Sequence, residues 1–118
     1  MQISPFKIER YFARYEFDVD YVLCGSDCES INLNVLDGFF DRHADRFAWQ
    51  RPRAGAIGFP KLLAEDVEDF CDALVKTAGV LLLPGSVYDD PGNHFRIGFG
   101  RKNMPAAVGR LADFLERR

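Results

Sequence analysis

Residues 84–100 read PGSVYDDPGNHFRIGFG, a loop of turn-forming residues followed by an alternating apolar run. The alternation predicts a strand that places Phe95, Ile97 and Phe99 on one face. Arg96 then points to the opposite face, and the neighbouring glycines leave room beside it. A guanidinium in this position presents a planar, permanently charged fork that fits a carboxylate. The stretch therefore makes Arg96 a candidate for carboxylate binding.

A second interpretation of Arg96 stays open at this level. The arginine could lie on the solvent face of the strand and pair with Asp89 or Asp90, which come from the preceding loop. Position along the strand alone favours this ion pair, because exposed arginines commonly pair with nearby carboxylates.

Outward from this stretch, apolar residues at helical spacing predict four helices. The first covers about residues 5–16 and begins at Ser4-Pro5, and the second covers residues 32–47 with an apolar stripe of Leu33, Leu36, Phe40 and Ala44. The third covers residues 67–78, between the cap Asp66 and Gly79. The last runs from the cap Asn103 through Leu115.

Short apolar runs predict the strands. They are Tyr21–Cys24, the pair Phe47–Gln50 and Ala54–Phe59 joined by Arg51-Pro52-Arg53, Val80–Leu83, and the run that holds Arg96. This order of elements predicts an α+β fold, in which a small, mainly antiparallel sheet has helices packed on one face. At 118 residues the chain is expected to form a single domain, residues 1–118.

Composition excludes several classes of function. The chain is 47% hydrophobic and 28% charged, and its net charge of -3 gives no basic surface for nucleic acid. No apolar stretch is long enough to span a bilayer. Three cysteines fit a reducing compartment, so a cytoplasmic location is expected. Cys24 and Cys28 have no second pair to complete a metal site, so no metal is expected.

Several motifs taken together resemble a known family. A long helix leads to Arg53-Ala54-Gly55-Ala56-Ile57-Gly58-Phe59, and a further helix leads to Gly79-Val80-Leu81-Leu82-Leu83-Pro84-Gly85-Ser86 and Asn93-His94-Phe95-Arg96-Ile97-Gly98-Phe99-Gly100. From about residue 32 to residue 118 this order is similar to the small domain of class I/II (fold-type I) aminotransferases, which depend on pyridoxal phosphate (PLP).

The beginning of the chain resembles the N-terminus of the same family, in particular capreomycidine-synthase-like members. The likeness lies in Ser4-Pro5-Phe6-Lys7-Ile8-Glu9-Arg10-Tyr11-Phe12 and Leu23-Cys24-Gly25-Ser26-Asp27-Cys28-Glu29-Ser30. In the family a large cofactor-binding domain separates these two regions. The resemblance therefore implies an N-terminal segment, residues 1–31, joined directly to a small domain, residues 32–118, without the large domain.

The absence of the large domain, which the resemblance implies, limits the reactions that this chain is expected to catalyse. PLP enzymes need a lysine that forms a Schiff base with the cofactor. The lysines here are Lys7, Lys61, Lys76 and Lys102, and none lies in the Ser-x-x-Lys context that the family uses. Ser4-Pro5-Phe6-Lys7 has that spacing, but it opens the predicted N-terminal helix and matches the family's N-terminus instead. We therefore expect no catalytic residue and no cofactor-binding residue, hence no cofactor, in this chain. Whether the chain acts as an enzyme stays open.

The resemblance also assigns candidate substrate-binding residues. Arg96 matches the arginine that binds the substrate's carboxylate in the family, which favours the first interpretation of this residue. Gly25 and Ser26 stand where relatives bring backbone N–H groups near the substrate, although a plain turn explains them equally well. Asp27 and Glu29 fit a solvated loop, and Cys24 and Cys28 would act as nucleophiles only beside a base.

The expected function is that of a small-domain remnant of an aminotransferase, not catalytic alone, that keeps a carboxylate-binding arginine. Two alternatives stay open. The chain could be an assembly module whose exposed apolar face binds a second copy or a partner domain. It could also be a small amino-acid-binding domain without any role in transamination. An amino acid or other carboxylate is the expected ligand, and neither nucleic acid nor membrane is expected as a partner.

Overall fold

The computed structural model describes residues 7–15, 18–24, 33–53 and 55–118. In chain order its elements are α1 (Lys7–Tyr15), β1 (Tyr21–Val22), α2 (Leu33–Arg42), β2 (Phe47–Ala48), β3 (Ile57–Gly58), β4 (Lys61–Leu62), α3 (Val67–Ala78), β5 (Val80–Leu81), β6 (Leu83–Pro84), the 3₁₀ turn η1 (Gly85–Tyr88), β7 (Phe95–Gly98) and α4 (Met104–Glu116).

The strands pair mostly in antiparallel fashion. β7 is the central strand of a three-stranded sheet in the order β3-β7-β6, where Arg96 lies opposite Leu83 and Ile97 lies opposite Gly58. β2 pairs with β4 in antiparallel fashion, and β1 pairs with β5 in parallel fashion. Four helices and small, mainly antiparallel sheets confirm the predicted α+β class.

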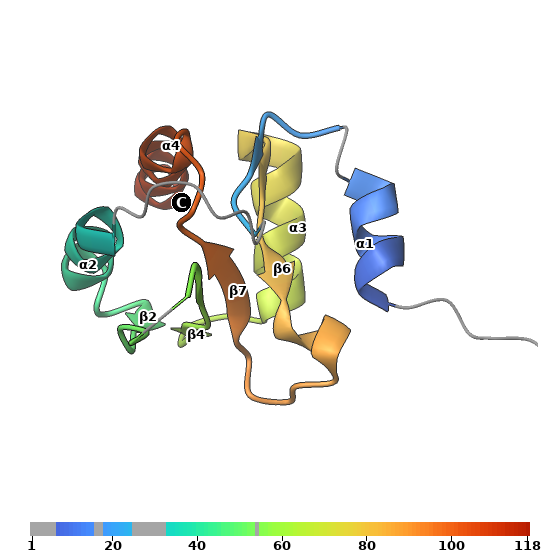
Figure 1. The fold of residues 1–118 in the computed structure, drawn as a ribbon, viewed down its shortest axis with the longest axis horizontal. Helices are drawn as coiled ribbons and strands as arrows, with labels where there is room; N and C mark the ends of the chain where they lie inside the picture. Colours follow the sequence, from blue (N-terminus) through green and yellow to red (C-terminus); the bar gives the residue numbers. More distant parts are fainter. Residues whose placement is uncertain (1–6, 16–17, 25–32, 54) are drawn as a thin grey trace, which may run out of the picture.

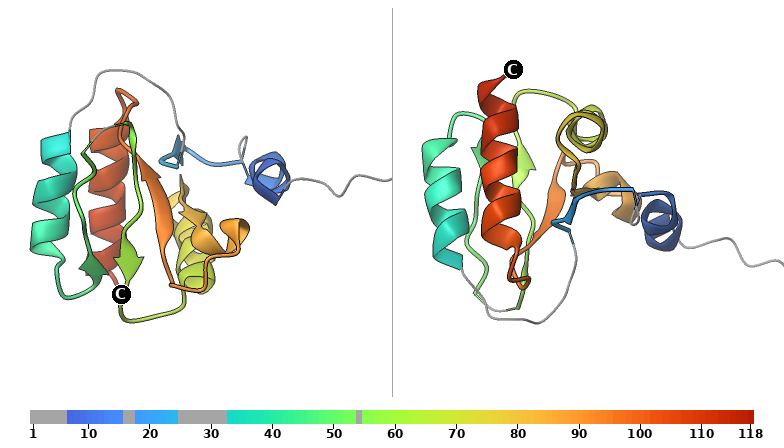
Figure 2. Two further views of the ribbon diagram at one scale, coloured as in Figure 1. Left: turned by 60° about the horizontal axis from the view of Figure 1, so that its bottom comes forward. Right: turned by 90° about the horizontal axis from the view of Figure 1, so that it is seen from above.

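The strand segment that follows α3 divides the interior into two clusters, because successive side chains of a strand point to opposite faces. Leu82 joins the main cluster, which α2, α3 and α4 cover, whereas Leu81 and Leu83 belong to a smaller cluster covered by α1. Figures 1 and 2 show α2 and α4 on one side of the strands and α1 on the other.

Phenylalanine fills the main cluster. β7 and the residue that follows it place Phe95, Ile97 and Phe99 in it, each at most 1% exposed, while Arg96 of β7 is half-buried on the other face. This confirms the two faces that the alternation predicts. Other phenylalanines in the cluster are Phe39, Phe40, Phe47, Phe70 and Phe114.

Local signals define α3 as predicted. The Asp66 side chain accepts hydrogen bonds from the backbone N–H groups of Glu68 and Asp69, at 2.9 and 3.1 Å. At the other end, Gly79 adopts the left-handed conformation, with φ of 67°, and its N–H donates to the Val75 carbonyl. The left-handed backbone conformation at this position favours glycine.

Replacing Asp66 with alanine is expected to lower the free energy of unfolding by about 1 kcal/mol, because two N–H groups of the first turn lose their acceptor. Urea denaturation followed by circular dichroism measures the change. Asp66→Asn is the matched control, since an asparagine oxygen also caps helices, and it should retain most of the stability. Equal losses in the two variants would contradict the capping role.

Two predictions about residues 32–59 are wrong. α2 ends at Arg42 rather than at Phe47, because residues 43–46 form a turn and Phe47 enters β2. Ala44 is therefore exposed instead of lying on the apolar stripe. β2 also does not pair with the run before Phe59. It pairs with β4, which places Phe47 opposite Leu62, while β3 pairs with β7.

Three further elements differ in detail. The predicted strands Tyr21–Cys24 and Val80–Leu83 are shorter: the first ends at Val22, and the second is divided into β5, which pairs with β1, and β6, which pairs with β7. Asn103 does precede α4, but its side chain makes no capping hydrogen bond. The predicted cap Ser4-Pro5 lies outside the described residues.

Candidate functional site

Arg96 is held by two hydrogen bonds from different parts of the chain. Its Nε donates to the carbonyl oxygen of Cys24 at 2.8 Å, and its Nη1 donates to the Tyr88 hydroxyl at 2.6 Å. The guanidinium carbon also lies 5.9 Å from the centre of the Phe12 ring of α1. Residues just after β1, at the end of η1 and within α1 therefore fix the direction of this side chain.

These bonds leave part of the guanidinium available. An arginine has five N–H groups, and the two bonds to described residues use one on Nε and one on Nη1. A carboxylate contacts an arginine end-on through one N–H of Nη1 and one N–H of Nη2. Within the described structure the geometry therefore permits a two-point contact with a carboxylate.

The described structure gives other partners to the two aspartates that could have paired with Arg96. The ammonium of Lys7 forms an ion pair with Asp89. Asp90 lies 3.0 Å from Nδ1 of His94, and this hydrogen bond lowers the pKa of the Asp90 carboxyl group. Both aspartates thus have other partners, and the ion-pair interpretation of Arg96 loses the partners that the sequence offered.

Two of the predicted binding residues, Gly25 and Ser26, lie outside the described residues, as do Asp27, Cys28 and Glu29. Their nearest described neighbour in the chain is Cys24, whose carbonyl accepts the hydrogen bond from Arg96. The structure therefore joins Arg96 to the start of the predicted turn.

Three residues beside Arg96 were not among the predicted site residues. Tyr88 contacts the guanidinium directly, Phe12 lies under it, and the strand register places Phe59 opposite Arg96. The position of Phe59 follows from the register, because Gly58 pairs with Ile97 and the N–H of Phe95 donates to the Pro60 carbonyl. The predicted strand pair hid this neighbour, since it joined residues 54–59 to β2 instead of to β7.

The cysteines offer no nucleophile in the described part of the chain. Cys24 and Cys71 are both buried, with 0% and 1% of their surface exposed. Burial raises the pKa of the Cys71 thiol, so it stays protonated and inert at neutral pH. The two histidines hydrogen-bond elsewhere, His43 to the Phe39 carbonyl and His94 to Asp90.

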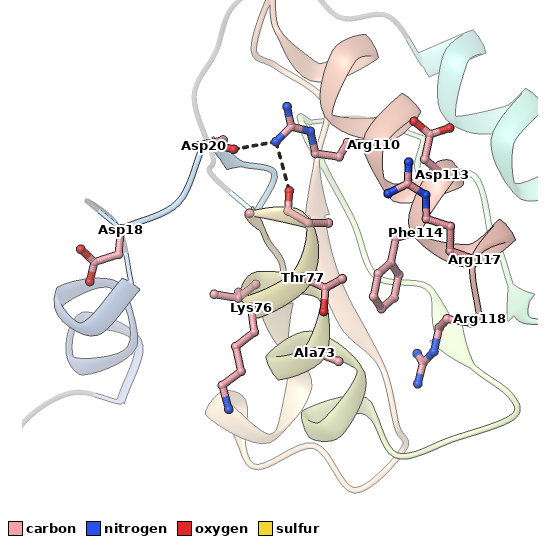
Figure 3. A pocket seen from close by; sticks show the side chains of 13 residues that line it. Asp18, Asp20, Ala73, Lys76, Thr77, Arg110, Asp113, Phe114, Arg117 and Arg118 are labelled. Atoms are coloured by element: carbon pink, nitrogen blue, oxygen red, sulfur yellow. Dashed lines mark hydrogen bonds and ion pairs between the residues drawn. The ribbon is translucent and has the colours of Figure 1, made fainter.

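A separate groove of about 700 Å³ lies between the ends of α3 and α4 (Figure 3). Two of its arginines are already engaged. Arg110 reaches Asp20 at 2.6 Å and the Ala78 carbonyl at 3.3 Å, and Arg118 forms two bonds of 2.8 Å with Glu65. These contacts fasten the segment before β1 and the end of α4 to the rest of the fold. The groove therefore has the character of a structural junction.

The described residues contain neither a metal-binding cluster nor a membrane-spanning helix. No group of three or more histidine, cysteine, aspartate or glutamate side chains is placed to hold a metal ion there. No helix in the same part of the chain has the length and apolar character needed to cross a membrane.

Comparison with known proteins gives matches among solved structures. No family model matches the chain, and no curated protein does. A PLP-dependent aminotransferase from Streptococcus suis matches with 29% identity and a TM-score of 0.63, over 73% of this chain and 23% of that chain. The PLP-dependent cyclase OrfR matches with 28% identity and a TM-score of 0.64, over 73% of this chain and 25% of that chain.

This chain has the fold of part of a fold-type I PLP-dependent aminotransferase. An aspartate aminotransferase from Rhodobacter sphaeroides extends the likeness to 97% of this chain, with a TM-score of 0.59. Its 24% identity shows a shared fold alone. The chain spans about a quarter of the length of these aminotransferase structures.

The residues of this chain do not fit PLP as a covalently bound cofactor. A lysine that forms a Schiff base must lose its proton, which requires burial or a neighbouring cation to lower its pKa. All four lysines, Lys7, Lys61, Lys76 and Lys102, are exposed. Asp72 hydrogen-bonds to Lys76 and raises the pKa of its ammonium, and Lys7 pairs with Asp89. No step through PLP is therefore derived for this chain.

Proposed function

We propose that this chain is an aminotransferase small-domain unit that binds the carboxylate of an amino acid through Arg96 and does not transaminate by itself. The observation that carries the proposal is the anchoring of Arg96 by two hydrogen bonds to described residues, which use two of its five N–H groups. The match to aminotransferases over 97% of the chain supports the view that residues 1–31 and 32–118 correspond to the N-terminal segment and the small domain.

Binding is expected to be weak. A single partly exposed ion pair contributes about 0–1 kcal/mol, and no cofactor adds contacts here. Since a dissociation constant of 1 mM needs about 4 kcal/mol, a value well above about 1 mM is expected for a simple amino acid such as L-alanine. Specificity for one amino acid over another would depend on the side chains around Arg96.

Titration of the ¹⁵N-labelled chain with L-alanine, followed by NMR, tests the carboxylate site. Saturable shifts are expected at Tyr88 and at residues 95–97. Arg96→Lys keeps the charge but removes the planar fork, so it should abolish saturation. Arg110→Lys is the matched control, because that arginine already pairs with Asp20, and it should bind as the original chain does. Equal binding by Arg96→Lys would overturn the proposal.

The absence of catalysis has its own test. The chain is mixed with PLP, reduced with borohydride, and its labelled lysines are mapped by mass spectrometry. Low, unselective labelling is expected, because all four lysines are exposed. Stoichiometric labelling of one lysine would overturn this part of the proposal.

A second function, as an assembly module, rests on a different observation. Phe59 and Tyr88 contact each other and expose 43% of their surface each, and Leu63 exposes 51%; exposed apolar patches mark interaction sites. A second copy of the chain or a separate partner domain would cover them. Light scattering over a range of concentrations tests self-association, and a strict monomer at high concentration would count against a homo-oligomer.

A further inference from the structure

Two exposed aromatic rings lie beside Arg96 and touch each other. Among the described residues, Phe59 and Tyr88 each leave 43% of their surface exposed. Their ring centres are 6.4 Å apart, and the rings are perpendicular, at 82°. Aromatic pairs favour this edge-to-face geometry. Tyr88 contacts the guanidinium through its hydroxyl, and Phe59 is opposite Arg96 in the strand register and in contact with Tyr88.

The rings are held in place before any ligand arrives. Phe59 stacks on His94 with ring centres 5.0 Å apart and an angle of 8° between the planes. His94 is itself fixed by Asp90 at 3.0 Å. Tyr88 is fixed at its hydroxyl by Arg96. A surface that is already ordered loses little side-chain entropy on binding, which favours affinity.

From this juxtaposition we infer that the ligand of Arg96 carries an aromatic group next to its carboxylate, as in an arylalkanoic or aromatic amino acid. The carboxylate contacts the available N–H groups of Arg96, and the aromatic group packs on Phe59 and Tyr88. The inference rests on the proposed carboxylate site and deepens it by naming the class of ligand. Aliphatic carboxylates use only the arginine, so they bind more weakly.

The same chemistry is present in two sources, a free aromatic acid and the C-terminal aromatic residue of a peptide. Both present one carboxylate and one ring at a short separation. They differ at nitrogen, which is a free amine in the amino acid and an amide in the peptide. The two sources can therefore be distinguished by acetylating the nitrogen of the probe.

The experiment compares propionate with 3-phenylpropionate on the full chain by NMR titration. The ring should tighten binding about tenfold, as an edge-to-face contact with partial burial of a ring provides. Phe59→Leu, which keeps an apolar side chain without the flat face, should bring the two affinities close together by weakening the binding of 3-phenylpropionate. Leu63→Ala is the matched control, since it removes another exposed apolar side chain and should keep the preference.

The outcomes separate the two proposals. Equal affinity for the two probes, with Arg96-dependent binding of both, overturns the aromatic preference and leaves the carboxylate site intact. Binding of neither probe overturns both. A preference for the aromatic probe that survives Phe59→Leu also overturns the inference. When the preference is seen, tight binding of N-acetyl-L-phenylalanine supports a peptide C-terminus, and binding of L-phenylalanine alone supports a free amino acid.

Discussion

Replacing Phe95 with alanine is expected to lower the free energy of unfolding by about 3–5 kcal/mol. Phe95 is fully buried on β7, the central strand of the three-stranded sheet. Its ring lies 5.7 Å from the ring of Phe47 and 6.3 Å from that of Phe70, measured between centres. Those neighbours come from β2 and α3, so the cavity would open where sheet and helix meet. Small domains have only about 5–15 kcal/mol of stability in total.

Urea denaturation monitored by circular dichroism measures this loss. Phe95→Leu keeps most of the volume and should cost clearly less than the alanine variant. Phe59→Ala is the matched control on the surface, because 43% of that side chain is already exposed, and its loss should be smaller still. A loss below about 1 kcal/mol for Phe95→Ala would contradict the packing of β7 against Phe47 and Phe70.

Adding one methyl group at Gly85 is expected to destabilise the fold by about 1–3 kcal/mol, as overpacking does. A β-carbon there would lie 2.8 Å from the His94 carbonyl oxygen, 2.9 Å from the Asp90 carboxylate and 3.1 Å from the Phe59 ring. The carbonyl belongs to the backbone, and it also accepts the Gly85 N–H at 2.7 Å, so it cannot move without losing that bond.

Gly109→Ala is the matched control and should have the opposite sign. Gly109 lies in α4 with no atom within 4 Å of its added β-carbon, so alanine there gains about 0.5–1 kcal/mol from helix propensity. Thermal unfolding of both variants measures the difference. In Gly85→Ala the NMR signals of Tyr88 and Arg96 should also shift, because η1 must move. Two variants with equal stability would contradict the crowding at Gly85.

Sequence signals predicted the structure best where the physics is local. A cap such as Asp66 acts on N–H groups two and three residues away, and a left-handed end such as Gly79 depends on one residue's own φ. The faces of β7 were also predictable, since the side-chain alternation of a strand is a property of its backbone. Each of these features can be read within a few positions of the sequence.

Strand pairing was harder to predict, because it depends on contacts distant in the sequence. The short spacing between Phe47–Gln50 and Ala54–Phe59 favoured a hairpin, yet burial of Phe47 against Leu62 selects β4 as the partner of β2. The end of α2 failed for a related reason: Phe47 continues the apolar spacing of the helix but is needed in β2.

The candidate site also combines a local feature that could be predicted with long-range contacts that could not. Arg96 could be singled out by its place in an apolar strand, and its exposure on the second face agrees with that prediction. Its partners could not be predicted, because Cys24 and Phe12 come from the other end of the chain. Asp89 and Asp90 looked available in the sequence, but Lys7 and His94 take them. Gly25 and Ser26 stay predictions.

The parallel ladder between β1 and β5 has a consequence for the order of folding. β5 follows α2, three strands and α3 in the chain, and no tight turn can join strands that run in the same direction. Such distant pairings form late, since the long intervening loop must first be closed. The segment ending at Cys24 is thus expected to pair with β5 after β7 has formed. Only then does Arg96 form its hydrogen bond to the Cys24 carbonyl. Carboxylate binding by Arg96 is therefore expected to appear only after this late folding step.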